Sequence, residues 1–162
     1  MKIGLIDYDG KIPNLALMKL SAYHKARGDE VYFGSIPNDC EKVYCSVLFT
    51  WNKAKAERLR LAYPNIEFGG TGYDIEKKLP PEIDALEPDY DLYTTGEIYS
   101  RICRGIGTKK AKLKKAETIR NMGIGFTTRG CVRNCAFCVV PRKEGKLRQA
   151  SEIRDIVRPG SN

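Results

Sequence analysis

Short apolar runs alternate with helical patterns along the first third of the chain. Residues 2–7, KIGLID, are apolar and end at the turn-forming YDG, so they predict a buried strand. A helix is predicted next, between Pro13, which suits a first helical turn, and Gly28, which suits a C-terminal cap. Residues 30–33 predict a second strand. The apolar positions of this helix recur at helical spacing, at Leu15, Met18, Ala22 and Ala26.

The order of strand, helix and strand is predicted a second time in the next segment. Residues 43–49 predict a third strand, and Asn52 is a candidate cap for a helix over residues 53–63 that Pro64 would stop. Residues 65–68 then predict a fourth strand. Strands that alternate with helices are typical of a parallel α/β sheet. We therefore expect a Rossmann-like, doubly wound α/β domain.

The glycine-rich run GGTGYD, residues 69–74, follows the fourth predicted strand. It lacks the Lys-Ser/Thr pair of a P-loop and the spacing of a dinucleotide-binding fingerprint. We therefore interpret it as a tight turn, because glycine serves turns readily. If the run binds a ligand, Thr71 and Asp74 are the candidate contacts.

Charge divides the chain into two regions. Residues 1–107 hold 14 Lys or Arg against 16 Asp or Glu, whereas residues 108–162 hold 14 against 4. We predict a Rossmann-like domain over 1–107 and, over 108–162, a basic linker with a cysteine-containing region. A basic segment can meet phosphates, so RNA is a possible partner, although charge runs usually face water. The densest run comprises Lys109, Lys110, Lys112, Lys114 and Lys115.

Three of the six cysteines, Cys131, Cys135 and Cys138, lie within eight residues. No signal-peptide pattern and no apolar run long enough to span a membrane occurs in the sequence, so we expect a cytoplasmic protein in which clustered cysteines bind metal rather than form disulfides. A structural zinc site needs a fourth ligand. Candidates for that ligand are Cys40, Cys45, Cys103 and His24.

Three thiolates can instead hold three irons of a [4Fe–4S] cluster and leave the fourth iron without a protein ligand. The run Cys131-Val-Arg-Asn-Cys135-Ala-Phe-Cys138 resembles the CxxxCxxC signature of the radical S-adenosylmethionine (radical SAM) superfamily, including the aromatic residue before the last cysteine. The resemblance implies that S-adenosylmethionine binds the open iron and is cleaved reductively. It also implies that Phe137 contacts the adenine, and that a flavodoxin or ferredoxin supplies electrons.

The resemblance extends to flanking segments. The runs MKIGLIDYDG and FGGTGYD are similar to the opening domain of uncharacterised bacterial and phage radical SAM proteins, which is akin to cobalamin-binding domains. Cobalamin itself is not expected, because Asp7-Tyr8-Asp9-Gly10 lacks the histidine of the base-off cobalamin motif. The run CAFCVVPRKEGKLR is similar to methylthiotransferases that modify tRNA or a ribosomal protein, which is kept as an alternative. Cys40, Cys45 and Cys103 do not match the second cluster site of those enzymes.

The segments around the cysteines predict the start of a partial barrel. Residues 125–129 predict a strand that leads into the cysteine loop, and residues 147–157 carry a weak helical pattern with Ser151 as a possible cap. The 24 residues after Cys138 suffice for one strand–helix unit, since each further unit takes about 30 residues. We therefore expect the first βα unit of a barrel, and enzymatic activity only if a longer barrel completes it. The non-enzymatic alternative is a zinc-stabilised module that binds nucleic acid or protein.

Overall fold

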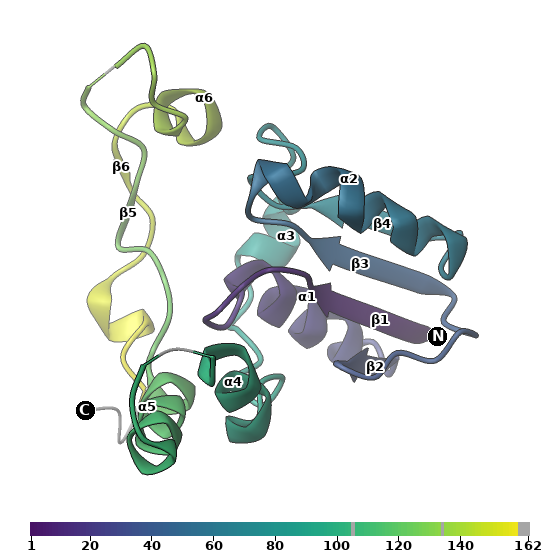
Figure 1. Ribbon diagram of the computed structural model, residues 1–162. Coiled ribbons are helices and arrows are strands. Elements are labelled where there is room, and N and C mark those ends of the chain that lie inside the picture. The colour runs from purple at the N-terminus through teal and green to yellow at the C-terminus, as the bar shows by residue number, and fades with distance from the viewer. Residues whose placement is uncertain (105, 134, 159–162) are drawn as a thin grey trace. The chain divides into compact units, whose positions relative to one another are not determined.

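The computed structural model of the protein describes residues 1–104, 106–133 and 135–158. The last four residues of the predicted second region thus lie outside the described residues. The chain divides into two compact units, Met1–Arg120 and Asn121–Asn162 (Figure 1). Within the described residues, no helix has both the length and the apolar character that crossing a membrane requires.

A four-stranded parallel sheet forms the centre of the first unit. Its strands are β1 (Lys2–Asp7), β2 (Glu30–Phe33), β3 (Lys42–Ser46) and β4 (Ile66–Gly69), in the order β2-β1-β3-β4. All three strand pairs are parallel. The predicted mixed α/β class with a parallel sheet is therefore confirmed, and the arrangement is consistent with a Rossmann-like fold.

Strand β3 is shorter than the predicted strand over residues 43–49. After Ser46 the backbone leaves the regular ladder, and the amides of Leu48 and Phe49 donate to the carboxylate of Asp9 at 2.8 and 3.1 Å. A side chain of the neighbouring loop thus takes the place of a strand partner. This contact between distant segments could not be predicted from the local pattern.

Helix α1 (Leu15–Ala26) connects β1 to β2. The side chain of Asn14 caps it by accepting hydrogen bonds from the amides of Ala16 and Leu17. Pro13 precedes this cap and does not lie in the first helical turn, so that prediction was wrong by two residues. Gly28 follows the helix at a φ of 78°, which confirms its predicted role at the C-terminal end.

The predicted helix over residues 53–63 consists of shorter pieces. The segment contains the 3₁₀ turn η1 (Thr50–Asn52), helix α2 (Lys53–Ala56) and the 3₁₀ turn η2 (Glu57–Leu61). Asn52 makes no side-chain cap, because its Nδ2 donates instead to Oδ2 of Asp9 at 2.9 Å. The helical turns end before Pro64, as predicted.

Apolar layers cover both faces of the sheet, and Figure 1 shows α1 and α2 on opposite faces. Both faces of a parallel sheet are normally buried in this way. The α1 side is built mainly from Ile3, Leu5, Leu17, Met18, Leu20, Ile83, Leu92, Tyr93, Ile98, Ala116 and Ile119. The α2 side is built from Cys40, Val43, Cys45, Val47, Ala56, Ile66 and Phe68.

Three helices complete the first unit: α3 (Pro81–Asp84), α4 (Thr95–Ile102) and α5 (Lys109–Asn121). The lysine run therefore lies on a helix. Ala116 and Ile119 of α5 are buried in the core on the α1 side. Because of this burial, the first compact unit extends beyond the predicted boundary at residue 107.

The second unit contains a short antiparallel ribbon of β5 (Thr128–Arg129) and β6 (Arg148–Gln149), with helix α6 (Val140–Glu144) between the strands and the 3₁₀ turn η3 (Ile153–Asp155) after them. The predicted strand over residues 125–129 forms only at its end. The predicted helix over residues 147–157 was wrong. Ala150 instead donates its amide to the carbonyl of Thr127, which extends the ribbon.

Candidate functional site

The cysteine loop joins β5 to α6, so the chain order is strand, cysteine loop, helix. At its start, the amide of Cys131 donates to the carbonyl of Gly145 at 3.2 Å. Gly130 has a φ of 87°, and a Cβ atom at this position would lie 2.1 Å from the carbonyl oxygen of Lys146. Only glycine therefore permits this close approach of the two chain segments. The loop is closed at its base by backbone contacts.

Two backbone amides make contacts within the segment that contains the three cysteines. The amide of Arg133 lies 3.4 Å from Sγ of Cys131, and the amide of Cys138 donates to the carbonyl of Cys135 at 3.0 Å. The second contact forms a turn that spans the CxxC pair. All three thiols are free of disulfides and partly exposed. They are therefore accessible to a metal ion or cluster from solvent.

The structure does not gather these thiols into a completed site. Among the residues it describes, no three His, Cys, Asp or Glu side chains are placed so that they could share a metal ion. The donor set nevertheless fits an iron–sulfur cluster, because thiolates are its usual protein ligands and three of them lie on one accessible loop. Binding would require the side chains of Cys131, Cys135 and Cys138 to turn toward a common centre.

Phe137 belongs to this loop and is 94% exposed. Nearby, Val132 is also largely exposed. Neither side chain therefore belongs to the hydrophobic core. The structure gives Phe137 no packing role, and the predicted contact with adenine stays a prediction.

The other four candidate metal ligands are either buried in the core or engaged in hydrogen bonds within the first unit. Cys40 and Cys45 are buried on the α2 side of the sheet, and burial raises the pKa of the Cys45 thiol to about 12. Nδ1 of His24 lies 2.7 Å from Oδ2 of Asp29. The thiol of Cys103 donates to the carbonyl of Ser100 at 3.1 Å. Each of these residues thus has a structural environment within the first unit.

Glu144 ties the end of α6 to the ribbon. Its carboxylate lies 3.3 Å from the guanidinium of Arg129 on β5, and its backbone carbonyl accepts a hydrogen bond from Arg148 on β6. The Arg129 guanidinium also lies 4.6 Å from the centre of the Phe126 ring. These contacts fix the helix that follows the cysteines relative to the strand that precedes them.

A buried polar network, which the sequence reading missed, lies at the carboxyl end of β1. Oδ2 of Asp7 accepts a hydrogen bond from Tyr93 at 2.8 Å and lies 3.0 Å from the Arg101 guanidinium. Oδ1 accepts from the amide of Gly10 at 3.0 Å. Burial raises the pKa of Asp7, although Arg101 and the hydrogen bonds oppose the shift. The only sequence signal was an acidic residue at the end of an otherwise apolar strand.

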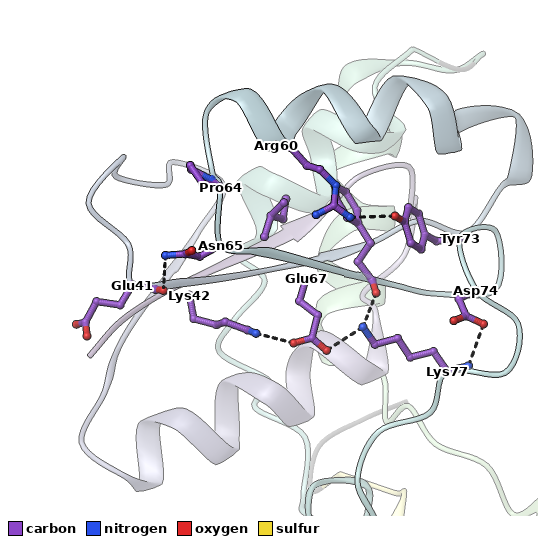
Figure 2. Close-up of a pocket in the computed structure, with 11 residues that line it drawn as sticks. Glu41, Lys42, Arg60, Pro64, Asn65, Glu67, Tyr73, Asp74 and Lys77 are labelled. Carbon is purple, nitrogen blue, oxygen red and sulfur yellow. Dashed lines mark hydrogen bonds and ion pairs between the residues drawn. The ribbon is translucent and has the colours of Figure 1, made fainter.

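A shallow groove of about 560 Å³ runs along β4, the edge strand of the sheet (Figure 2). Its cationic groups have carboxylate partners: Glu67 lies 2.7 Å from Lys42 and 2.8 Å from Lys77, and Arg60 lies 2.7 Å from Glu57. Lys77 also donates to the Phe68 carbonyl on the strand edge at 2.7 Å. We interpret this arrangement as protection of the edge strand, because charged side chains discourage pairing with other strands.

The glycine-rich run after β4 forms a turn, as the sequence predicted. The amides of Tyr73 and Asp74 donate to the carbonyl of Gly70, which has a φ of 92°. A Cβ atom at Gly72 would lie 2.4 Å from the amide nitrogen of Phe49. The carboxylate of Asp74 accepts from the amides of Glu76 and Lys77. The run thus packs this turn against the loop that follows β3.

Comparison with known protein families, with curated proteins and with solved structures found no match to this chain.

Proposed function

We propose that this chain is an iron–sulfur protein of the radical SAM type, in which Cys131, Cys135 and Cys138 bind a [4Fe–4S] cluster. The observation that carries the proposal is the CxxxCxxC spacing on a loop whose three thiols are free and partly exposed. The chain order of strand, cysteine loop and helix is the order expected at the start of a radical SAM barrel, although β5 pairs with β6 antiparallel, whereas neighbouring strands of a (β/α) barrel are parallel. The loop offers three cysteines, which suits a cluster with one open iron, whereas structural zinc takes four protein ligands.

When bound, such a cluster supplies an iron that is free of protein ligands, where S-adenosylmethionine can bind and be cleaved reductively. The chain itself provides thiolates and backbone amides. The Arg133 amide lies within reach of Sγ of Cys131, and hydrogen bonds to cluster sulfurs tune reduction potentials. Within residues 121–158 there are eight Lys or Arg against three Asp or Glu, so the segment around the cysteines carries a net positive charge.

Two further roles belong to this proposal. Exposed Phe137 contacts the adenine of S-adenosylmethionine, and a flavodoxin or ferredoxin delivers the electron.

We do not propose cobalamin as a cofactor, because Asp9 occupies the position in the loop after β1 where the base-off motif carries histidine. The Asp9 carboxylate accepts hydrogen bonds from three donors: the Leu48 amide, the Phe49 amide and the Asn52 side chain.

Anaerobic reconstitution with iron and sulfide tests the cluster. We expect about four irons and four sulfides per chain, with a broad absorption in the blue region of the visible spectrum. Cys135→Ala should lose this absorption, whereas Cys103→Ala, which changes a partly exposed cysteine outside the loop, should keep it. Stoichiometric zinc without this absorption, or unchanged iron content in Cys135→Ala, would contradict the proposal. Binding of S-adenosylmethionine to the cluster is tested separately: it should change the electron paramagnetic resonance spectrum of the reduced cluster.

A second candidate function, binding of RNA phosphates, is favoured by α5. Lys109, Lys110, Lys114 and Lys115 of this helix are exposed, whereas Lys112 is partly buried and donates to the Cys103 carbonyl at 2.6 Å. Replacing Lys109, Lys110 and Lys114 by Gln should weaken binding of a short RNA. It should also reduce the dependence of affinity on salt concentration, because fewer counterions would be released. Equal affinity and salt dependence in this variant and the unsubstituted protein would exclude α5 as the contact surface.

A further inference from the structure

The sheet of the first unit has a topological switch point between β1 and β3. From β1 the chain passes through α1 to β2 on one side, whereas β3 and β4 lie on the other side. Open α/β sheets bind ligands outside the carboxyl ends of their strands at such a point. The segments at this place are the loop after β1 and the loop after β3, which contains Phe49 and Trp51.

Phe49 and Trp51 form a stacked pair on the loop after β3. Their ring centres are 4.7 Å apart, and the ring planes meet at 16°. Phe49 is 42% exposed and Trp51 is 71% exposed. Since Phe49 covers one face of the indole, the large exposure of Trp51 leaves its other face open to solvent. The protein thus presents a flat aromatic surface that contributes little to the core.

Neighbouring loops hold this aromatic pair in place. The Asp9 carboxylate accepts hydrogen bonds from the amides of Leu48 and Phe49 and from the side chain of Asn52, which bracket the pair in sequence. From the other side, Gly72 approaches the backbone so closely that a Cβ atom would lie 2.4 Å from the Phe49 amide nitrogen. The exposed aromatic face is therefore preorganised, which lowers the entropic cost of binding a ligand.

Basic residues flank the pair in sequence. Lys53 and Lys55 follow it and Lys11 lies in the loop after β1, and all three are exposed; Nζ of Lys53 donates to the Tyr73 carbonyl at 3.0 Å. The sequence has no Asp or Glu between Glu41 and Glu57. The nearest acidic residue shown to contact the loop is Asp9, whose carboxylate already accepts hydrogen bonds from it. A planar, anionic ligand therefore matches both the shape and the charge of this surface.

We propose that Phe49 and Trp51 form a stacking platform for the base of a nucleotide, with the neighbouring lysines attracting its phosphate. Aromatic side chains beside positive charge are the usual means of holding an unpaired base. This inference concerns the first unit alone and does not depend on the cluster. The base can belong to a free nucleotide or to a single strand of RNA, and the two sources are separated by experiment.

Trp51 is the only tryptophan in the chain, so its fluorescence reports on this surface directly. The full chain, without reconstitution, is titrated with AMP, with ribose 5-phosphate and with a short oligoadenylate. We expect saturable quenching by AMP and no comparable effect of ribose 5-phosphate, which lacks a base. Quenching by the oligoadenylate alone would assign the platform to RNA. Absence of saturable quenching by either base-containing probe, or equal quenching by ribose 5-phosphate, would overturn the proposal.

Variants test the aromatic pair. Phe49→Leu keeps apolar bulk but removes the flat ring that supports Trp51, and should weaken binding about tenfold, because stacking contributes at this level. Trp51→Ala, measured by calorimetry, should lose binding, and Trp51→Phe should retain part of it. The control is Leu61→Ala, which changes another apolar side chain that is 91% exposed. Unchanged affinity in both Phe49→Leu and Trp51→Ala would also overturn the proposal.

Discussion

The hydroxyl of Tyr93 donates a hydrogen bond of 2.8 Å to the carboxylate of Asp7, 86 residues earlier in the chain. The same hydroxyl accepts a hydrogen bond from the amide of Asn14, the residue that caps α1. Arg101 of α4 lies 3.0 Å from Asp7 and also donates to the Gly10 carbonyl at 2.9 Å. These contacts join the end of β1, the start of α1 and the segment through α4 around one buried carboxylate.

Removing the hydroxyl should therefore destabilise the first unit. We expect Tyr93→Phe to lower the free energy of unfolding by about 1–3 kcal/mol, because a buried carboxylate and a partly buried amide each lose a partner. Urea denaturation measures the change. The matched control is Tyr32→Phe, which removes a 2.8 Å hydrogen bond to the carboxylate of Glu30 at an exposed position. The control should change stability by less than about 0.5 kcal/mol. Equal losses in the two variants would contradict a special role of the buried network.

The buried Asp7 also predicts a dependence of stability on pH. Burial raises its pKa above the usual value of 3.8, so the folded protein holds the proton more tightly than the unfolded chain. The contribution of Asp7 to stability is therefore full below pH 3.8 and declines as the pH rises through the folded-state pKa. Asp7→Asn cannot titrate. We expect the stability of the unsubstituted protein relative to Asp7→Asn to fall as the pH rises.

Urea denaturation of both proteins between about pH 4 and about pH 8 checks this expectation, because the difference between them isolates Asp7. Carboxylates with a lowered pKa, such as Asp29 beside His24, act in the opposite direction and cancel in the comparison. A relative stability that rises with pH would show that the attraction of Arg101 outweighs the cost of burial.

The six cysteines should differ in their reaction with iodoacetamide. Cys131, Cys135 and Cys138 are partly exposed, whereas Cys45 is buried and its pKa is raised to about 12. Because the thiolate is the reactive form, we expect alkylation of the loop cysteines of the folded, reduced, metal-free protein and protection of Cys45. Peptide mass spectrometry measures each site. The unfolded protein in urea, where all six should react, is the control, and rapid labelling of Cys45 in the folded protein would contradict its burial.

Gly130 should be essential to the cysteine loop. Gly130→Ala adds a Cβ atom 2.1 Å from the Lys146 carbonyl oxygen at a φ of 87°, and should open the base of the loop. Gly145→Ala is the matched control, since its φ is 76° but no atom lies within 4 Å of the added carbon. Both variants carry a strained backbone conformation, which costs about 1–3 kcal/mol. Only Gly130→Ala should also lower iron incorporation several-fold under reconstitution, and equal iron content in the two variants would contradict the role of this contact.

Local sequence patterns correctly predicted those strands and helix ends of the first unit that depend on neighbouring residues. The apolar runs at 2–7 and 30–33 coincide with β1 and β2, and Gly28 ends α1 at a positive φ. These features depend on residues that are close in sequence, such as an apolar stretch beside a turn. The predictions for β4 and for the turn after it were accurate for the same reason, and the strand starts only one residue later than expected.

Predictions failed where contacts between distant residues decide the backbone. β3 ends early because Asp9 takes up the amides after it, and the same carboxylate engages Asn52, which the pattern had assigned to a helix cap. The expected helix over residues 147–157 does not form, because residues 148–151 pair with residues 127–129 instead and only Ile153–Asp155 form a 3₁₀ turn. Its helical pattern was weak, and the pairing with the preceding segment outweighed it.

The sequence by itself determined the parallel α/β class of the first unit, because strand periodicity is a property of neighbouring residues, and it contains the CxxxCxxC spacing on which the proposed cluster rests. Only the tertiary structure decided that Asp7 is enclosed by Tyr93 and Arg101, and that the loop after β3 holds Phe49 and Trp51 at the switch point. The physical reason is that burial and hydrogen bonding between segments far apart in the chain depend on how the sheet brings those segments together.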